Sequence, residues 1–369
     1  MASITAGIAV LKAVTSPAAI GFIPVAIEFR LFDLLVELKE PVNAERVLAA
    51  YKDEIKGHDA KTPNPGVLLI ADTLFAMAGL GFVDITSDEL YSPNEITRHL
   101  AAFQSAQHGA LHFATEALLG ATFLMPKLKA ENLAYPFEEL DTPIQYGYRQ
   151  MGNEQFAKQH TYSIMAEQGR MDSFNIFMAG KFMKANSVPE RMKVLGYDFQ
   201  FVLNEATADT SRTLVDIGGG RGELLLEIKE AFPQLQTSDL VVQEFNDDIG
   251  NVEGVTQVTW DFKAENSPQP IKGALVYHLA HILHNLPDLE AVRLLQKISE
   301  AMAPHSRLLL HEFGKNANHG KMHATMIVLF GGRERSSSEW HQMAALAGLK
   351  VTFEVYPPFG EGLIEMRKA

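Results

Sequence analysis

The sequence contains no cysteine among its 369 residues. This absence excludes disulfide bonds and thiolate metal sites within the chain. It fits an intracellular protein, and we expect a cytoplasmic location. Hydrophobic residues make up 47% of the chain, which is enough to bury a large core. The length indicates two domains or three.

Basic residues are few for a chain of this length. The sequence has 32 Lys and Arg against 45 Asp and Glu, which gives a formal net charge of −13. Because an acidic surface repels phosphate backbones, we expect no nucleic-acid partner.

A long uninterrupted apolar run is also missing. Residues 5–27 are largely apolar, but Lys12 interrupts them and Pro17 and Pro24 break the run. Neither a signal peptide nor a membrane-spanning helix has this pattern, so we expect no membrane partner. We expect instead a buried pair of N-terminal helices, which could lie at a subunit interface.

The pattern of the first hundred residues predicts three helices followed by a hairpin. Apolar residues repeat with helical spacing in 25–37, a second helix begins at Asn43, and a third covers 66–79. Two short β-like runs then follow in 82–94. This order is typical of a winged helix. Residues 66–79 contain no Lys or Arg, which favours a role of this part in packing or dimerisation over a role in DNA binding.

The chain changes character near residue 211. Residues 100–200 are mostly helical in pattern, with a Phe- and Met-rich stretch at 172–192, whereas short apolar runs and helices alternate afterwards. This alternation predicts a doubly wound α/β sheet. The expected strands lie in 213–220, 239–245, 273–283, 306–313 and 349–356, with helices over 222–231 and 288–302. We expect three parts: a helical winged-helix part at 1–105, a helical connecting and pocket part at 106–200, and the α/β domain at 201–369.

A glycine-rich turn, LVDIGGGRGE at 214–223, follows the first of these strands. Without a Cβ, the backbone can bend tightly and approach a ligand closely. The dinucleotide pattern G-x-G-x-x-G would need a glycine where Glu223 stands, so the spacing rejects a dinucleotide. Asp216 before the turn would repel a pyrophosphate and attract a cationic amino-acid group.

Two further acids follow the next two expected strands. Glu244, next to Phe245, can accept hydrogen bonds from both hydroxyls of a ribose. Asp261 and Phe262 suit an amine and a flat ring. Three acids in register behind consecutive strands indicate a nucleoside cofactor with a cationic end.

This series resembles the S-adenosylmethionine (SAM) site of class I methyltransferases. From about residue 20 onward the chain resembles the plant and fungal small-molecule O-methyltransferases of the caffeate and flavonoid type. The resemblance implies a Rossmann-like SAM-binding domain, an N-terminal winged-helix dimerisation domain and a homodimer. It also implies a cofactor site that includes Asp216, Gly218, Gly220 and Glu244.

The resemblance extends to a catalytic base. The family carries its base in a stretch similar to residues 284–288, which puts His284 at the base position and Glu312 and Glu334 at the two acids that hold it. Removal of a hydroxyl proton by a histidine suits methyl transfer, because the cofactor is already activated. A carboxylate on the far nitrogen of the ring fixes its tautomer.

A substrate pocket is expected along two helical stretches. His108 and His112 are spaced i, i+4 and share a helix face, where they could contact substrate or hold a metal. Phe174 and Met178 match family positions that line the acceptor pocket. We assign no metal, since no third ligand stands near the two histidines. We interpret His278 and His281 as residues without matching acids, and His305, His319, His323 and His341 as surface residues.

The chain departs from the family pattern beside the base. Asn285 and Leu286 replace an Asp and a Trp, and Ala280 replaces a Lys. Some fungal members of the family bind SAM but catalyse dehydrations or pericyclic reactions without methyl transfer. Asn285 and the histidines of the pocket keep this alternative open, while the complete base set favours O-methyl transfer to an aromatic or polyketide-derived metabolite. A third alternative, a regulatory protein built on the winged helix, conflicts with the missing basic residues.

Overall fold

The structure is a computed structural model that describes residues 5–56, 63–180, 186–206, 213–245 and 252–369. The chain forms two compact units. The first comprises Met1–Thr122 and Tyr162–Lys184, and the second comprises Phe123–Thr161 and Ala185–Ala369. Each unit therefore takes part of the 106–200 stretch, whereas the expected three parts are continuous in sequence.

The first unit is mainly helical and carries one small hairpin. Strands β1 (Val83–Ile85) and β2 (Tyr91–Pro93) pair antiparallel and follow α5 (Val67–Gly79). A π-helix, η1 (Phe113–Ala117), follows α7 directly. The helices are α1 Ala6–Ile20, α2 Ile23–Glu28, α3 Leu31–Leu38, α4 Ala44–Glu54, α5 Val67–Gly79, α6 Glu95–Ala102, α7 Gln104–His112 and α11 Met171–Ala179, while α8 Leu118–Ala130 and α10 Thr161–Glu167 contain the unit boundaries.

The expected helix at 25–37 is wrong as a single element. It is divided into α2 and α3 at Arg30, whose backbone is left-handed with φ of 51°. The Arg30 side chain lies 2.6 Å from Glu54 and 3.3 Å from Glu37, and these ion pairs offset part of the backbone strain. The next helix begins as expected, because the Asn43 side chain accepts from the Arg46 backbone N–H at 3.0 Å.

Within the single chain α1 is not buried, and the expected burial at a subunit interface stays a prediction. None of its described residues is buried, and the helix continues through Pro17 to Ile20. Four of its apolar side chains are at least 47% exposed: Ile8, Val10, Leu11 and Val14. Helix α2 joins the core of the first unit through Ile23 and Ala26, and Ile20 at the end of α1 packs against the same core.

The second unit is built around a seven-stranded sheet with the order β5-β4-β3-β6-β7-β9-β8. All strands are parallel except β9, which lies antiparallel between β7 and β8. The strands are β3 Leu214–Ile217, β4 Leu240–Glu244, β5 Thr256–Thr259, β6 Val276–Ala280, β7 Arg307–Phe313, β8 Leu349–Val355 and β9 Glu361–Lys368. The helices are α9 Pro143–Gln150, α12 Val188–Val194, α13 Phe199–Asn204, α14 Glu223–Ala231, α15 Asp288–Ala301, α16 Gly320–Phe330 and α17 Ser337–Leu346.

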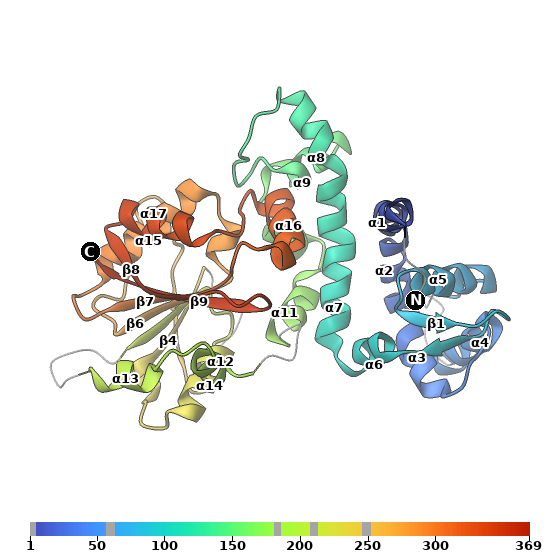
Figure 1. Ribbon diagram of the computed structural model, residues 1–369, viewed down its shortest axis with the longest axis horizontal. Helices are drawn as coiled ribbons and strands as arrows, with labels where there is room; N and C mark the ends of the chain where they lie inside the picture. Colours follow the sequence, from blue (N-terminus) through green and yellow to red (C-terminus); the bar gives the residue numbers. More distant parts are fainter. Residues whose placement is uncertain (1–4, 57–62, 181–185, 207–212, 246–251) are drawn as a thin grey trace. The chain divides into compact units, whose positions relative to one another are not determined.

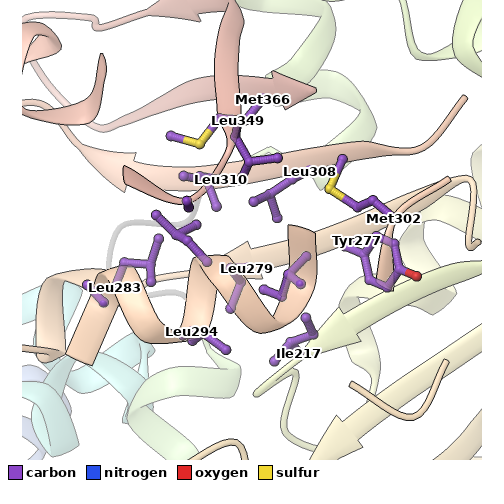
Figure 2. Packing of buried hydrophobic residues seen from close by; sticks show 14 of the residues in the cluster. Ile217, Tyr277, Leu279, Leu283, Leu294, Met302, Leu308, Leu310, Leu349 and Met366 are labelled. Carbon is purple, nitrogen blue, oxygen red and sulfur yellow. The ribbon is translucent and has the colours of Figure 1, made fainter. Parts of the chain in front are cut away.

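Helices cover both faces of this sheet, as the doubly wound prediction requires (Figure 1). Successive side chains of a strand point to opposite faces. Val215, Tyr277 and Leu308 face α15 and α17, in the cluster that Figure 2 shows from close by. Leu214 and Leu309 face α12, α13 and α14. Each buried Leu in these layers contributes about 1.5–3 kcal/mol to folding.

The sheet order places the glycine turn at the point where the order of successive strands reverses. Strand β3 pairs with β4 on one side and with β6 on the other. In open α/β sheets, ligands bind outside the carboxyl ends of the strands at such a point. Among the described residues, no helix is both long enough and apolar enough to cross a lipid bilayer.

Candidate active site

The glycine turn between β3 and α14 is packed too tightly for side chains. A Cβ on Gly219 would lie 2.3 Å from Asp216 Oδ2, and one on Gly222 would lie 2.9 Å from Val255. Gly222 also has φ of 96°, which a side chain would strain. The turn therefore needs glycine at both positions, and its backbone is left bare for a ligand.

Two of the predicted acids lie beside this turn, and one of them, Glu244, is hydrogen-bonded to it. Asp216 is buried at the end of β3, with Oδ2 against Gly219. Glu244 ends β4 and accepts from the Gly220 N–H at 2.6 Å through Oε1. Burial raises the pKa of the Glu244 carboxyl. Sequence reasoning placed Glu244 toward a ribose, and the structure shows that one of its oxygens also closes the turn.

The remaining predicted cofactor residues lie at the ends of β4 and β5. Phe245 is 63% exposed directly after Glu244. Asp261 is exposed and accepts from the Lys263 N–H at 3.0 Å, while Phe262 is half-buried against Trp260. Lys297 fixes this loop, because its Nζ donates to the carbonyls of Phe262 and Ala264 at 2.8 and 2.6 Å.

His284 lies in a short 3-10 turn, η4 (Leu283–Asn285), directly beyond β6. It is 6% exposed, and its Nδ1 lies 2.9 Å from Glu334 Oε1. Since a carboxylate accepts, this bond places a proton on Nδ1 and leaves the Nε2 lone pair free to accept a proton in the neutral ring.

Glu312 supports the same turn in a different way. Its Oε1 accepts from the Leu283 backbone N–H at 2.8 Å, and its Oε2 lies 3.8 Å from His284 Nδ1. The side chain is fully buried, and burial raises the pKa of this carboxyl. The structure thus brings His284, Glu312 and Glu334 together, with Glu334 as the direct partner of the ring.

Arg335 is a residue of this site that sequence reasoning missed. It is fully buried, and it donates to the carbonyls of Leu283 and Leu286 at 2.7 and 2.8 Å. It also pairs with Asp288 and lies over the Trp340 ring at 5.4 Å. Arg335 therefore clamps the turn that carries His284. The only sequence signal for a role of Arg335 was its position between Glu334 and Ser336, the residue that caps the next helix.

The interpretation of His281 as a residue without a matching acid is wrong. Its Nε2 lies 2.9 Å from Glu361 Oε1 at the start of β9, a strand that was not predicted. The backbone of His281 lies in the left-handed region, with φ of 55°, and the Asn285 side chain donates a hydrogen bond to its carbonyl at 2.9 Å. Burial alone would lower the pKa of His281, but Glu361 raises it. The Asn that replaces the family's Asp thus holds a strained histidine beside the base.

The interpretation of His278 as a residue without a matching acid is wrong as well. Its Nδ1 lies 2.7 Å from Asp216 Oδ1, and its Nε2 lies 2.7 Å from Nδ1 of His311. The Asp216 partner comes from β3 and the His311 partner from β7, so no local pattern could indicate them.

Three side chains near the base have a spacing that a metal could use. Within the described part of the chain, His281, His284 and Glu312 each offer a ligand atom, and these atoms lie within 4.8 Å of one another. One nitrogen of each histidine already contacts a carboxylate, Glu361 or Glu334. A carboxylate on one ring nitrogen fixes the orientation of a histidine, both in a general base and in a metal site.

The predicted pocket histidines belong to the first unit. His108 Nδ1 lies 2.8 Å from Ser173 Oγ, and buried His112 lies 3.2 Å from Glu116 within the π-helix turn. The ring of Phe174 lies 5.1 Å from that of His112, which supports an aromatic cluster around it. Met178 is 45% exposed on the same α11 helix. π-Helical turns often occur at functional sites.

The remaining histidines differ from the surface interpretation in one case. His319 is buried and bonds to the Gly314 carbonyl through Nδ1 at 2.7 Å, so that interpretation is wrong. His341 is exposed as expected, and His305 and His323 are half-buried.

Comparison with known proteins gives consistent matches over the whole chain. A family model described as an O-methyltransferase domain matches residues 137–350. The O-methyltransferase bfoE of Aspergillus brasiliensis is 50% identical over 364 residues, which cover 98% of this chain and 96% of the relative. The O-methyltransferase aunE of Aspergillus niger is 47% identical over 380 residues, with the same two coverages.

Solved structures share the fold at lower identity. The structure of LepI in complex with SAM has a TM-score of 0.80 at 20% identity, covering 99% of this chain and 90% of that one. OxaC in complex with S-adenosylhomocysteine (SAH) and oxaline has a TM-score of 0.80 at 18% identity, covering 100% of this chain and 88% of that one. These likenesses show that both units follow a known architecture.

Proposed function

The chain belongs to the O-methyltransferase family, and from that premise we propose that it transfers the methyl group of SAM to a hydroxyl of an aromatic or polyketide-derived metabolite. The observation that carries this proposal is the contact of His284 with Glu334 at 2.9 Å. It forms a general base on the sheet whose β3 ends in the glycine turn.

The residues of the glycine turn fit SAM. Gly219 and Gly222 let the turn pack closely on Asp216 and Val255, while a Cβ on Gly220 would meet nothing within 4 Å, so space for a ligand lies beside Gly220. The acids are Asp216, Glu244 and Asp261. Their carboxylates can accept hydrogen bonds from an amine and from ribose hydroxyls, and they would repel a pyrophosphate. We assign cofactor binding to these residues together with Gly218, Gly220, Phe245 and Phe262.

The protein supplies the base and its alignment. When bound, SAM supplies a methyl group on a positively charged sulfur, which is ready for displacement by an oxygen nucleophile. His284 takes the hydroxyl proton on Nε2 while Glu334 holds Nδ1. The imidazolium that forms is stabilised by Glu334 and Glu312, both buried. General-base catalysis of this kind contributes about 10²–10⁴-fold.

We assign acceptor binding to His108, His112, Phe174 and Met178 of the first unit and, separately, to Asn285 of the second unit. Support comes from the aromatic rings around His112 and from the π-helical turn that follows it. An aromatic and thioether lining favours a flat, apolar acceptor.

We also propose the finer features of the family for this chain. The helices α3 to α5 with the β1–β2 hairpin have the element order of a winged helix. The exposed apolar side chains of α1 favour a homodimer in which a second copy covers them. The division at residues 105 and 200 and the cytoplasmic location stay predictions.

Two measurements test the function. Purified protein is incubated with an extract of fungal metabolites and SAM labelled in its methyl group, and products are analysed by mass spectrometry. We expect a labelled product heavier by one methyl group. The His284→Ala protein should bind SAH normally and lose at least about 10²-fold in transfer rate. An unlabelled isomer or dehydrated product, formed only when SAM is present, would instead establish the alternative reaction without methyl transfer.

A further inference from the structure

Three buried polar side chains form a chain across neighbouring strands beneath the glycine turn. Asp216 on β3, His278 on β6 and His311 on β7 are 1%, 3% and 0% exposed. Two contacts of 2.7 Å join them, Asp216 Oδ1 to His278 Nδ1 and His278 Nε2 to His311 Nδ1. Buried polar groups are costly unless they are hydrogen-bonded, so this arrangement calls for a function.

The proton positions in this chain follow by elimination. The carboxylate of Asp216 accepts, so His278 carries a proton on Nδ1. If His278 were also protonated on Nε2, the proton of His311 would have to sit on its Nε2. That nitrogen is buried and has no hydrogen-bond partner among the residues that the structure describes. A buried N–H without a partner is rarer than an unshared lone pair.

Both histidines are therefore neutral, each with its proton on Nδ1. Burial holds the pKa of His311 well below its ordinary value, which agrees with a neutral His311 ring. The negative charge of the chain then lies on Asp216 alone. Within the described residues, no Lys or Arg lies within 4.0 Å of its carboxylate.

The second oxygen of Asp216 is directed at the glycine turn. Oδ2 is buried, has no hydrogen-bond partner among the described residues, and lies 2.3 Å from where a Gly219 Cβ would stand. Because His278 holds Oδ1, the carboxylate cannot rotate to exchange its two oxygens. The turn thus carries a fixed and unneutralised negative charge.

We propose that His278 and His311 are positioning residues of the cofactor site, which orient Asp216 so that its free oxygen supplies a negative charge to a cationic cofactor. This inference rests on the proposed function. The two histidines serve binding and not proton transfer. On β7, His311 and Glu312 are adjacent, so they point to opposite faces of the sheet. One strand therefore supports the cofactor turn on one face and the base on the other.

The experiment measures SAH and SAM binding by calorimetry, independently of turnover. His278→Leu should weaken both affinities by about tenfold or more, since a hydrogen bond to a charged group is lost. Its kcat at saturating SAM should stay within about twofold of wild type, because the base set is intact. His278→Asn should restore binding, since its amide N–H can take the place of Nδ1–H.

The matched control is Tyr277→Phe, on the opposite face of the same strand. It removes the hydrogen bond from Tyr277 to the Ile271 carbonyl at 2.7 Å, and should lower the Tm without changing SAH affinity. Wild-type SAH affinity in a folded His278→Leu protein would overturn the inference.

A spectroscopic measurement keeps the inference testable if His278→Leu does not fold. The ¹⁵N shifts of histidine-labelled wild-type protein should show His278 and His311 as neutral rings protonated on Nδ1. An imidazolium at His278 would overturn the inference. If His284→Ala loses methyl transfer but His278→Leu binds SAH normally, the inference fails and the proposed function stands. If the wild-type protein binds SAH but forms no methylated product, and His278→Leu binds SAH more weakly, the proposed function fails and the inference stands.

Discussion

Glu334 Oε1 lies 2.9 Å from Nδ1 of His284, and both side chains are buried. Glu312, by contrast, accepts a hydrogen bond from the backbone N–H of Leu283 through Oε1, and its Oε2 lies 3.8 Å from His284 Nδ1. The two acids beside His284 therefore have different contacts, one with the ring and the other mainly with the backbone of the turn.

Glu334→Gln should lower kcat by about 10²-fold or more, because an amide no longer stabilises the imidazolium. Glu312→Gln should cost less, since its amide oxygen can still accept from Leu283. Steady-state kinetics with a labelled methyl group checks both, and SAH affinity serves as the control. Equal losses in the two variants would contradict this difference between the two acids.

Arg335→Leu should destabilise the protein by about 1–3 kcal/mol for each of the two buried carbonyls, of Leu283 and Leu286, that it leaves without a donor. The matched control is Arg333→Leu, which also loses a contact with Asp288 but is 27% exposed. That change should cost about 1 kcal/mol or less. Chemical denaturation measures both, and kcat should fall only in the Arg335 variant.

The His281–Glu361 pair predicts a pH-dependent stability. Burial alone would raise the pKa of Glu361, but His281 and Arg191 hold it well below its ordinary value, while the pKa of His281 is raised. Stability from Glu361 is present above about pH 4.3, and stability from His281 is present below about pH 6.5. The pair therefore stabilises most between these values, and loses strength as pH rises through the raised pKa of His281.

Glu361→Gln should accordingly lower the Tm most near pH 5.5, and the difference from wild type should shrink between pH 7 and 9. A loss of about 1–2 kcal/mol corresponds to a few degrees in a chain of this size. Thermal unfolding at several pH values measures it. A difference that is constant with pH would show that the pair is not an ion pair.

Leu11→Asp should shift a dimer toward monomer, because it places a charge among the apolar side chains of α1 that this chain leaves 47% exposed or more. Light scattering after gel filtration measures the mass. Lys12→Glu on the same helix is the control and should leave the mass unchanged. A wild-type protein that is monomeric at all concentrations would exclude the dimer.

The sequence predicted the sheet well where the signal was local. The apolar runs before Gly218 and around Val241 became β3 and β4, and helices 222–231 and 288–302 lie within one residue of α14 and α15. Strand β9 was missed, because its run ends in Arg367 and Lys368 and its place between β7 and β8 depends on pairing distant in sequence.

The site shows the same limit. The turn with His284 could be read from a short motif, and the structure brings it to Glu312 and Glu334. The partners of His278 and His281 lie 62 and 80 residues away along the chain, on β3 and β9. A buried histidine in an apolar strand signals that a partner exists, but only the sheet order identifies it.

The division of the chain into two units has a consequence for biosynthesis. Helix α11 supplies Ser173 and Phe174 to the side chains of α7, yet it leaves the ribosome only after Phe123–Thr161 of the other unit. The N-terminal 122 residues therefore cannot complete their own packing while they are being synthesised. The nascent chain must keep His108 and His112 uncovered until about residue 184 has emerged, so a fragment that ends at residue 122 should depend on chaperones and resist isolation.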